Sequence, residues 1–349
     1  MAWLGDATQG GEQAAEAIME AARRLAAGGL VAFPTETVYG LGARADDDTA
    51  VARIFAAKGR PADHPLIVHV PDAEAAAAFA ADLPDVARRL MDAFWPGPLT
   101  VIVPRQPAIA AAAAGGQDTI GLRCPAHPVA HRLLVAAAAL GVPGVAGPSA
   151  NRFGRISPTQ AAHVLAEFAD LDDAALAVLD GGPCDVGIES SIVDCSTGRA
   201  VLLRPGVLTP EAIRAVTGEL HAPDAHAPRA SGTLAAHYAP RARLRLMSTE
   251  QLQQALPLIG PELTGAAGSG PALAVYSRSP LATLWPAGSR ARRLTHRAMP
   301  EAARAAAHEL FAALRELDAT GAPLIWVEAP PSEPEWDGVR DRLTRAAAA

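Results

Sequence analysis

The sequence predicts an α/β protein of more than one domain. Its 349 residues exceed the usual size of a single domain. Short apolar strands are repeatedly followed by a turn of glycine or proline with polar residues, a common place for a ligand in an α/β protein. After about residue 242 strands and helices alternate, which favours a parallel sheet. We expect domains at 1–215 and 242–349, joined by a linker or flap at 216–241 that is rich in proline, histidine and small residues.

Composition and charge narrow the class of protein. The net charge is −7, and residues 1–215 hold 16 basic and 24 acidic side chains. A protein that grips nucleic acid through its phosphates is usually basic, so no stable nucleic-acid complex is expected. The three cysteines form no CxxC pair, and we find no signal peptide and no apolar run of about 18 residues. The sequence therefore predicts a reduced cytoplasmic protein without a membrane span.

The first part alternates expected helices and strands. A helix over 12–27 ends at a glycine pair, residues 49–57 place three apolar side chains on one helical face, and 73–92 favours another helix. A serine–proline pair at 157–158 predicts one more helix start. Residues 1–11 are polar and expected to be loosely ordered. Strands are expected at 30–35, 65–70, 99–105, 119–125, 178–182, 187–196 and 200–206.

The last part repeats the alternation. Strands are expected at 243–247, 272–277 and 323–330, and helices at 249–256, 300–317 and 336–347. Proline stands at the start of the 300–317 helix, as is typical of a first helical turn. No motif in this part indicates chemistry.

Lys58 is the only lysine in the chain, beside 29 arginines. It stands in the loop Lys58-Gly59-Arg60-Pro61, where two cations one residue apart form a plausible phosphate clamp. An ammonium is a compact charge that suits one phosphate oxygen. The alternative is a surface lysine kept by chance.

Further polar residues end other expected strands. Alternation along the strand at 119–125 places Thr119 and Arg123 on one face. The only asparagine, Asn151, follows Ser149 in GPSANRFGR. His69 near the end of its strand is more often a packed residue than a ligand. No Walker loop, GxSxG elbow or set of three metal ligands is present, so the sequence predicts no metal site.

Eight motifs carry a resemblance to a known family. They are FPTETVYGLG, KGRP, PLIVHV, TIGLRCP, GPSAN, GIESSIVD, LLRPG and HYAP. In this order, over residues 20–240, the chain resembles the threonylcarbamoyl-AMP synthase (YrdC-like) family in its long form. The remainder matches more loosely, chiefly at WDGVRDRLTRAA.

The resemblance implies both a fold and a reaction. The implied fold is a YrdC-like twisted mixed sheet with a large concave cleft, plus a smaller Rossmann-like α/β domain. The implied reaction converts L-threonine, bicarbonate or CO2, and ATP with Mg²⁺ into threonylcarbamoyl-AMP and pyrophosphate. The product serves the threonylcarbamoyl modification of tRNA, and the expected protein partner is the downstream tRNA threonylcarbamoyl transferase.

The resemblance also assigns roles residue by residue. Lys58 and Arg60 match the pair that binds ATP phosphates and are the expected catalytic residues. The other expected nucleotide contacts are His64, Thr119, Ser149, Asn151, Arg204 and His237. The expected threonine contacts are Thr35, His69, Arg123 and Ser190. The chemistry needs no enzyme nucleophile, only two anions held close together and their charge neutralised.

One segment departs from the family pattern. The linker of the family typically reads SPGM followed by basic and aromatic residues, whereas residues 230–236 read ASGTLAA. The contacts with which this linker closes are therefore expected to differ.

Two other functions remain open at this point. One is an RNA-binding or ribosome-assembly module on the same fold, against which the acidic charge argues. The other is a carbamoyl-transfer domain, which is usually accompanied by a zinc finger that this chain lacks the CxxC pairs to build.

Overall fold

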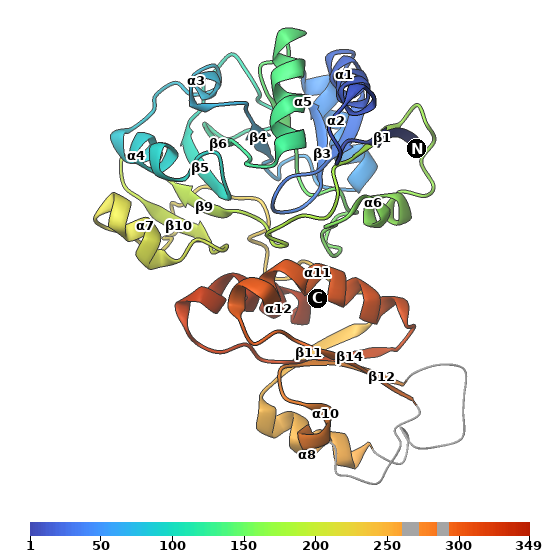
Figure 1. The fold of residues 1–349 in the computed structure, drawn as a ribbon. Helices are drawn as coiled ribbons and strands as arrows, with labels where there is room; N and C mark the ends of the chain where they lie inside the picture. The colour runs from blue at the N-terminus through green and yellow to red at the C-terminus, as the bar shows by residue number, and fades with distance from the viewer. Residues whose placement is uncertain (260–271, 285–292) are drawn as a thin grey trace. The chain divides into compact units, whose positions relative to one another are not determined.

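The computed structural model describes residues 1–259, 272–284 and 293–349. They divide into two compact units, the first of Met1–Phe153 and Ser157–Thr233, the second of Gly154–Ile156 and Leu234–Ala349. Each unit is a sheet with helices packed against it (Figure 1). The prediction of an α/β protein is confirmed. The expected linker is shared, since residues 216–233 belong to the first unit and 234–241 to the second.

The sheet of the first unit is mixed. Its strands are β1 (Ala2–Asp6), β2 (Leu30–Phe33), β3 (Gly40–Arg44), β4 (Ile67–His69), β5 (Leu99–Pro104), β6 (Thr119–Arg123), β7 (Val145–Ala146), β8 (Leu176–Asp180), β9 (Ser191–Asp194) and β10 (Val201–Arg204). Among the described residues these ten strands form one sheet in the order β1-β8-β2-β3-β7-β4-β6-β5-β9-β10. β4 runs parallel to β6 but antiparallel to β7, and β5 runs parallel to β9 but antiparallel to β6.

Helices cover both faces of this sheet. They are α1 (Glu12–Ala26), α2 (Asp48–Lys58), α3 (Ala73–Ala76), α4 (Asp85–Phe94), α5 (Pro128–Ala139), α6 (Ala161–Glu167) and α7 (Pro210–Thr217). Side chains alternate along β2, so Val31 and Phe33 pack under α1 and α5, whereas Leu30 and Ala32 pack in the core that contains α2, α4 and α6.

The end of α2 sets up the loop of the basic pair. Asp47 caps the start of α2 by accepting from the backbone of Thr49 and Ala50. Gly59 follows the last helical residue in the left-handed conformation, with φ of 62°. A glycine adopts this conformation without strain, so the chain turns sharply between Lys58 and Arg60.

Three sequence predictions for the first unit are wrong. The N-terminus is not loose, because Ala2–Asp6 forms strand β1 beside β8. Residues 73–92 do not form one helix but the short α3 and the separate α4, which begins after Pro84. Ser157 does not start a helix, since its hydroxyl donates to the buried Glu189 carboxylate at 2.5 Å and α6 begins only at Ala161.

The second unit contains a parallel sheet, as predicted. Its described strands are β11 (Arg243–Met247), β12 (Leu273–Ser277), β13 (Leu294–Ala298) and β14 (Leu324–Glu328), in the order β11-β14-β12-β13 with every pair parallel. The described helices are α8 (Thr249–Leu258), α10 (Leu281–Leu284), α11 (Ala303–Ala319), the 3₁₀ turn η1 (Pro334–Trp336) and α12 (Asp337–Ala347).

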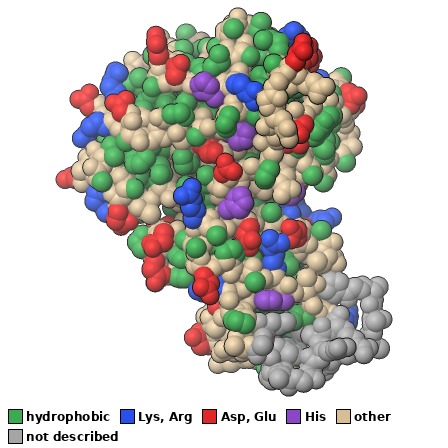
Figure 2. Space-filling view, viewed as in Figure 1, with side chains coloured by type: hydrophobic (Ala, Val, Ile, Leu, Met, Phe, Trp, Pro, Cys, Tyr) green, Lys and Arg blue, Asp and Glu red, His purple; other side chains and the backbone are tan. Residues whose placement is uncertain are grey.

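The surface carries charges of both signs. Figure 2 shows acidic and basic side chains interspersed among apolar ones on the face drawn. No helix among the described residues combines the length and apolar character needed to cross a bilayer.

Candidate active site

Lys58 is a buried cation held by uncharged groups. Its ammonium donates to the backbone carbonyl of Ser149 at 2.6 Å and to the carbonyl of Asn151. Burial, and next the charge of Arg60, holds the pKa of Lys58 well below its usual value. Both hydrogen-bond partners are neutral, so the positive charge is not compensated by them. Such a site favours an anionic ligand.

The remainder of the basic loop lies beside the same turn. The Arg60 guanidinium donates to the Pro65 carbonyl at 3.0 Å and lies 5.6 Å from the centre of the Phe153 ring. His64 meets the same ring edge to face at 5.3 Å. Burial, then Arg60, lowers the pKa of His64. Phe153 therefore links Arg60 and His64.

Backbone contacts fix the two loops against each other. The amide of Phe153 donates to the carbonyl of Lys58 at 2.8 Å. Gly40, at the start of β3, bridges to Ser149, and Ala150 donates to Tyr39. The turn after β7 is thus tied to both α2 and β3, which explains why residues distant in sequence converge there.

Arg123 is the centre of a second buried group, at the end of β6. Its guanidinium donates to the Thr37 hydroxyl at 2.8 Å and to the Gly97 carbonyl at 3.3 Å. Its remaining nitrogen lies 2.7 Å from a carboxylate oxygen of Glu36. This last contact is an ion pair by distance only, because it lacks the geometry of a hydrogen bond.

Thr35 and His69 border this group. The Thr35 hydroxyl donates to the Val38 carbonyl at 2.6 Å and shares a hydrogen bond with the Thr37 hydroxyl. His69 on β4 stands opposite Arg123 on β6. Burial, followed by the charge of Arg123, lowers the pKa of His69 to about 3. The imidazole is therefore neutral at physiological pH.

Ser190 and Arg204 are in direct contact. The guanidinium of Arg204 donates to the carbonyl of Ser190 at 2.9 Å and to its hydroxyl at 3.3 Å. The Ser190 hydroxyl also shares a hydrogen bond of 2.8 Å with Thr100 on β5. Arg204 further donates to the carbonyl of Ser231 at 2.7 Å, within the expected linker. An expected threonine contact and an expected nucleotide contact thus lie side by side.

Thr119 lines a small cavity beneath the linker. The cavity, of about 20 Å³, is bounded by residues of β4, β5, β6 and β9 and by Arg229–Ser231. Thr119 and Gly121 both line it, as the alternation along β6 predicts. The linker is fastened here by the amide of Gln117, which donates to the Arg229 carbonyl and accepts from its backbone N–H.

His237 belongs to the second unit. Its backbone N–H donates to Arg345 at 3.2 Å, and its ring lies edge to face with Tyr238 at 4.2 Å. Tyr238 in turn packs against Phe311 of α11. These contacts fix the HYAP segment within the second unit, and the role of His237 toward a nucleotide stays a prediction.

The expected site residues do not share one edge of the sheet. Because β7 runs antiparallel to β4, Ser149 follows β7 at the end where β4 begins, whereas His69 lies where β4 ends. Arg123 reaches from the end of β6 to the loop after β2. Side-chain contacts instead join Arg123 with Thr37 and Arg204 with Ser190.

Four residues of the site were missed by the sequence analysis. Glu36 and Thr37 lie between recognised residues of TETVYG, and Glu189 precedes Ser190, so their position within the motifs was the available signal. Phe153 closes GPSANRF and could have been noticed as an aromatic residue beside a cationic loop. The hydrophobic periodicity of the sequence does not indicate any of these four residues.

The described residues offer no activated nucleophile in this site. The three cysteines are free and buried, and burial raises the pKa of Cys124 to about 11 and that of Cys195 to about 12. The described residues also contain no group of three or more histidine, cysteine or acidic side chains placed to hold a metal ion. The arrangement is suited to binding anions and to stabilising charge that develops between them.

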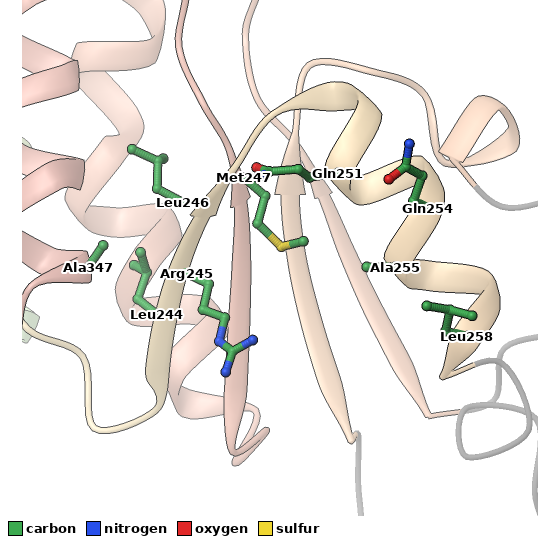
Figure 3. Close-up of a pocket in the computed structure, with 9 residues that line it drawn as sticks. All are labelled: Leu244, Arg245, Leu246, Met247, Gln251, Gln254, Ala255, Leu258 and Ala347. Atoms are coloured by element: carbon green, nitrogen blue, oxygen red, sulfur yellow. The ribbon is translucent and has the colours of Figure 1, made fainter.

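A larger cavity lies in the second unit and contains none of the expected site residues. It measures about 580 Å³. Figure 3 shows Arg245, Met247 and Gln251 among the side chains that line it, with the remaining walls formed mostly by aliphatic residues of β11 and α8.

Fold and site together define an α/β protein with a buried pair of cations whose surroundings suit an anionic ligand. Two family models cover most of the chain: the Sua5/YciO/YrdC model, described as telomere recombination, matches residues 23–206, and the threonylcarbamoyl-AMP synthase C-terminal domain matches 208–348. The chain belongs to the threonylcarbamoyl-AMP synthase family.

Relatives and solved structures agree with this assignment. The threonylcarbamoyl-AMP synthase of Bacillus subtilis is 41% identical over 72% of this chain and 73% of its own length. The Pyrococcus abyssi enzyme is 43% identical over 62% of this chain and 64% of its own. The structure of P. abyssi Sua5 complexed with L-threonine covers 98% of this chain and 96% of that one, with 34% identity and a TM-score of 0.83.

Proposed function

We propose that this protein makes threonylcarbamoyl-AMP and pyrophosphate from L-threonine, CO2 or bicarbonate, and ATP. The observation that carries the proposal is the buried Lys58–Arg60 pair in a member of this family, with Lys58 held by the carbonyls of Ser149 and Asn151. Lys58, whose two hydrogen-bond acceptors are uncharged, and the nearby Arg60 suit a triphosphate, because its oxygen atoms bring negative charge to both cations.

The proposed nucleotide site is formed by residues around these cations. Lys58 and Arg60 bind phosphate oxygens and neutralise charge as the reaction proceeds. The other nucleotide contacts we propose are His64, Thr119, Ser149, Asn151, Arg204 and His237. The contact between Arg204 and Ser190 supports a nucleotide next to the amino-acid substrate.

The proposed threonine site is the buried group at Arg123. A guanidinium binds a carboxylate through two parallel hydrogen bonds, which suits the carboxylate of an amino acid. Thr35, His69 and Ser190 complete this site. A neutral His69 offers a hydrogen-bonding ring without adding a third positive charge.

The chemistry is addition followed by displacement. The threonine amine loses a proton and its lone pair attacks the carbon of CO2, which gives a carbamate after loss of the second proton to water. A carbamate oxygen then attacks the α-phosphorus of ATP, and the bond to the β-phosphate oxygen breaks with its electron pair leaving on pyrophosphate. The protein contributes position and charge neutralisation.

Mg²⁺ would enter this site as part of its substrate. Because the described residues contain no cluster of metal ligands, the oxygen atoms of ATP and water would hold most of the ion's coordination sphere. It would supply further neutralisation of phosphate charge. We further propose a cytoplasmic location, and delivery of the product to a tRNA threonylcarbamoyl transferase.

The test is pyrophosphate release by the purified protein with MgATP and bicarbonate. We expect release with L-threonine and little release without it or with L-serine. Mass spectrometry should identify threonylcarbamoyl-AMP as the accompanying product. Release that does not depend on threonine would overturn the proposal.

A further inference from the structure

The Glu36 carboxylate is buried without hydrogen bonds. Its side chain is 8% exposed, and neither oxygen accepts a hydrogen bond from the described residues. Its backbone is fixed, since the Glu36 carbonyl accepts from Val186 at 2.7 Å. Among the described residues its ion-pair partner is Arg123, whose other two nitrogens donate to Thr37 and Gly97.

An ionised carboxylate without hydrogen bonds is costly in a protein interior. Buried polar atoms almost always have partners, and each exception calls for a ligand, an ion or water. The Ser157–Glu189 contact shows the usual arrangement in the same unit, where a hydroxyl donates to the buried carboxylate. Both carboxylate oxygens of Glu36 are therefore open to a donor from outside the described residues.

We propose that Glu36 binds the ammonium group of the amino-acid substrate while Arg123 binds its carboxylate. This inference rests on the proposed function and adds a residue to it. An amino acid is a zwitterion, and a cation and an anion 2.7 Å apart present the complementary pair of charges. Each of the two buried charges then gains a partner, and the substrate is oriented by both of its ends.

A different role for the Glu36–Arg123 contact predicts the opposite effect on threonine binding. If Glu36 only occupies Arg123 in place of the substrate carboxylate, its removal would free the guanidinium and tighten threonine binding. If Glu36 binds the ammonium, its removal weakens threonine but leaves unchanged any ligand that has the carboxylate and no ammonium.

The experiment compares two ligands by calorimetry on the full chain. One is L-threonine, and the other is its analogue with a hydroxyl in place of the ammonium. We expect Glu36→Gln to weaken threonine roughly 10- to 100-fold, the usual worth of a hydrogen bond to a charged group. The analogue should bind to the variant and the wild type within about threefold. Unchanged or tighter threonine binding, or equal weakening of both ligands, overturns the inference.

Controls separate this result from damage to the fold. Asp194→Asn removes another buried carboxylate of the same unit, one that accepts from Ser196, and should leave threonine binding unchanged. If Glu36→Gln does not fold, Glu36→Asp replaces it, since this variant keeps the charge but shortens the side chain by one carbon. It should also weaken threonine binding more than analogue binding, by a smaller factor than Glu36→Gln. Failure of the wild type to bind threonine would instead refute the proposed function.

Discussion

Lys58 and Arg123 are both buried cations of the first unit, yet they are held in opposite ways. Lys58 donates to two neutral backbone carbonyls. Arg123 lies 2.7 Å from the carboxylate of Glu36. The hydrogen-bond acceptors of Lys58 bring no negative charge, whereas the carboxylate of Glu36 offsets the charge of Arg123.

The difference indicates what each region can bind. A buried cation whose hydrogen-bond acceptors are neutral gains most from a ligand that brings negative charge, such as a phosphate. A compensated pair suits a ligand with both charges, because each end of a zwitterion then meets a side chain of opposite charge. The proposed nucleotide site and the proposed threonine site therefore call for ligands of different charge, and substitutions can test each of them.

The largest effect is expected for Arg123→Met. It leaves the Glu36 carboxylate buried without a countercharge, which typically destabilises a protein by about 3–5 kcal/mol. The double variant Arg123→Met with Glu36→Gln should recover most of that loss, because no buried charge remains. Urea unfolding of the four proteins measures both quantities. A double variant as unstable as the single one would refute charge compensation as the role of the pair.

Lys58→Ala should instead lower the rate of the reaction at the bound nucleotide. Loss of one positioned charge at a reacting phosphate typically lowers the rate by about 10²–10³-fold. Lys58→Arg should not restore it, because a planar fork cannot occupy the place of an ammonium between two carbonyls. Arg53→Ala, an exposed cation on the same helix, is the matched control. Full pyrophosphate release by Lys58→Ala would show that the lysine is structural.

The sequence predicted those residues of the two sites that lie in recognisable motifs or local patterns. Strand periodicity placed Arg123 correctly on β6, and composition singled out Lys58 because it is the only lysine. Both inferences depend on local patterns. The expected parallel sheet of the second unit follows in the same way from local alternation.

What remained hidden depends on contacts between distant segments. Nothing near Glu36 in the sequence shows that it meets Arg123, 87 positions away. Strand β1 was missed because its five residues form a strand by pairing with β8, a segment far away in the sequence. The helix expected at 73–92 failed for a related reason, since alanine favours helix wherever it occurs and cannot mark where tertiary packing interrupts one.

Acid sensitivity should follow from His69. Its pKa is about 3 in the folded protein and near 6.5 when unfolded, so the unfolded chain binds a proton first as the pH falls. Stability from the neutral imidazole is complete above about 6.5 and is lost between 6.5 and 3. At pH 4.5 this loss is about 2–3 kcal/mol, or 1.36 kcal/mol for each pH unit below 6.5.

The variant His69→Gln tests that dependence. Between pH 7.5 and 4.5 it should lose about 2–3 kcal/mol less than the wild type, as measured by urea unfolding at both values. His131→Gln, which replaces an exposed histidine on α5, serves as the control. Parallel losses in wild type and His69→Gln would mean that His69 is not the group whose protonation opposes folding.

Arg229→Ala should have the smallest effect, although it breaks a pair of the same chemistry as Arg123 and Glu36. Arg229 lies 2.8 Å from Asp63, but the two side chains are 54% and 63% exposed. An exposed ion pair contributes at most about 1 kcal/mol, and the backbone contacts of Arg229 with Gln117 remain. We therefore expect a loss below 1 kcal/mol in urea unfolding, fading further in 0.5 M salt. A loss as large as that of Arg123→Met would show that burial does not determine how much such an ion pair contributes to the free energy of unfolding.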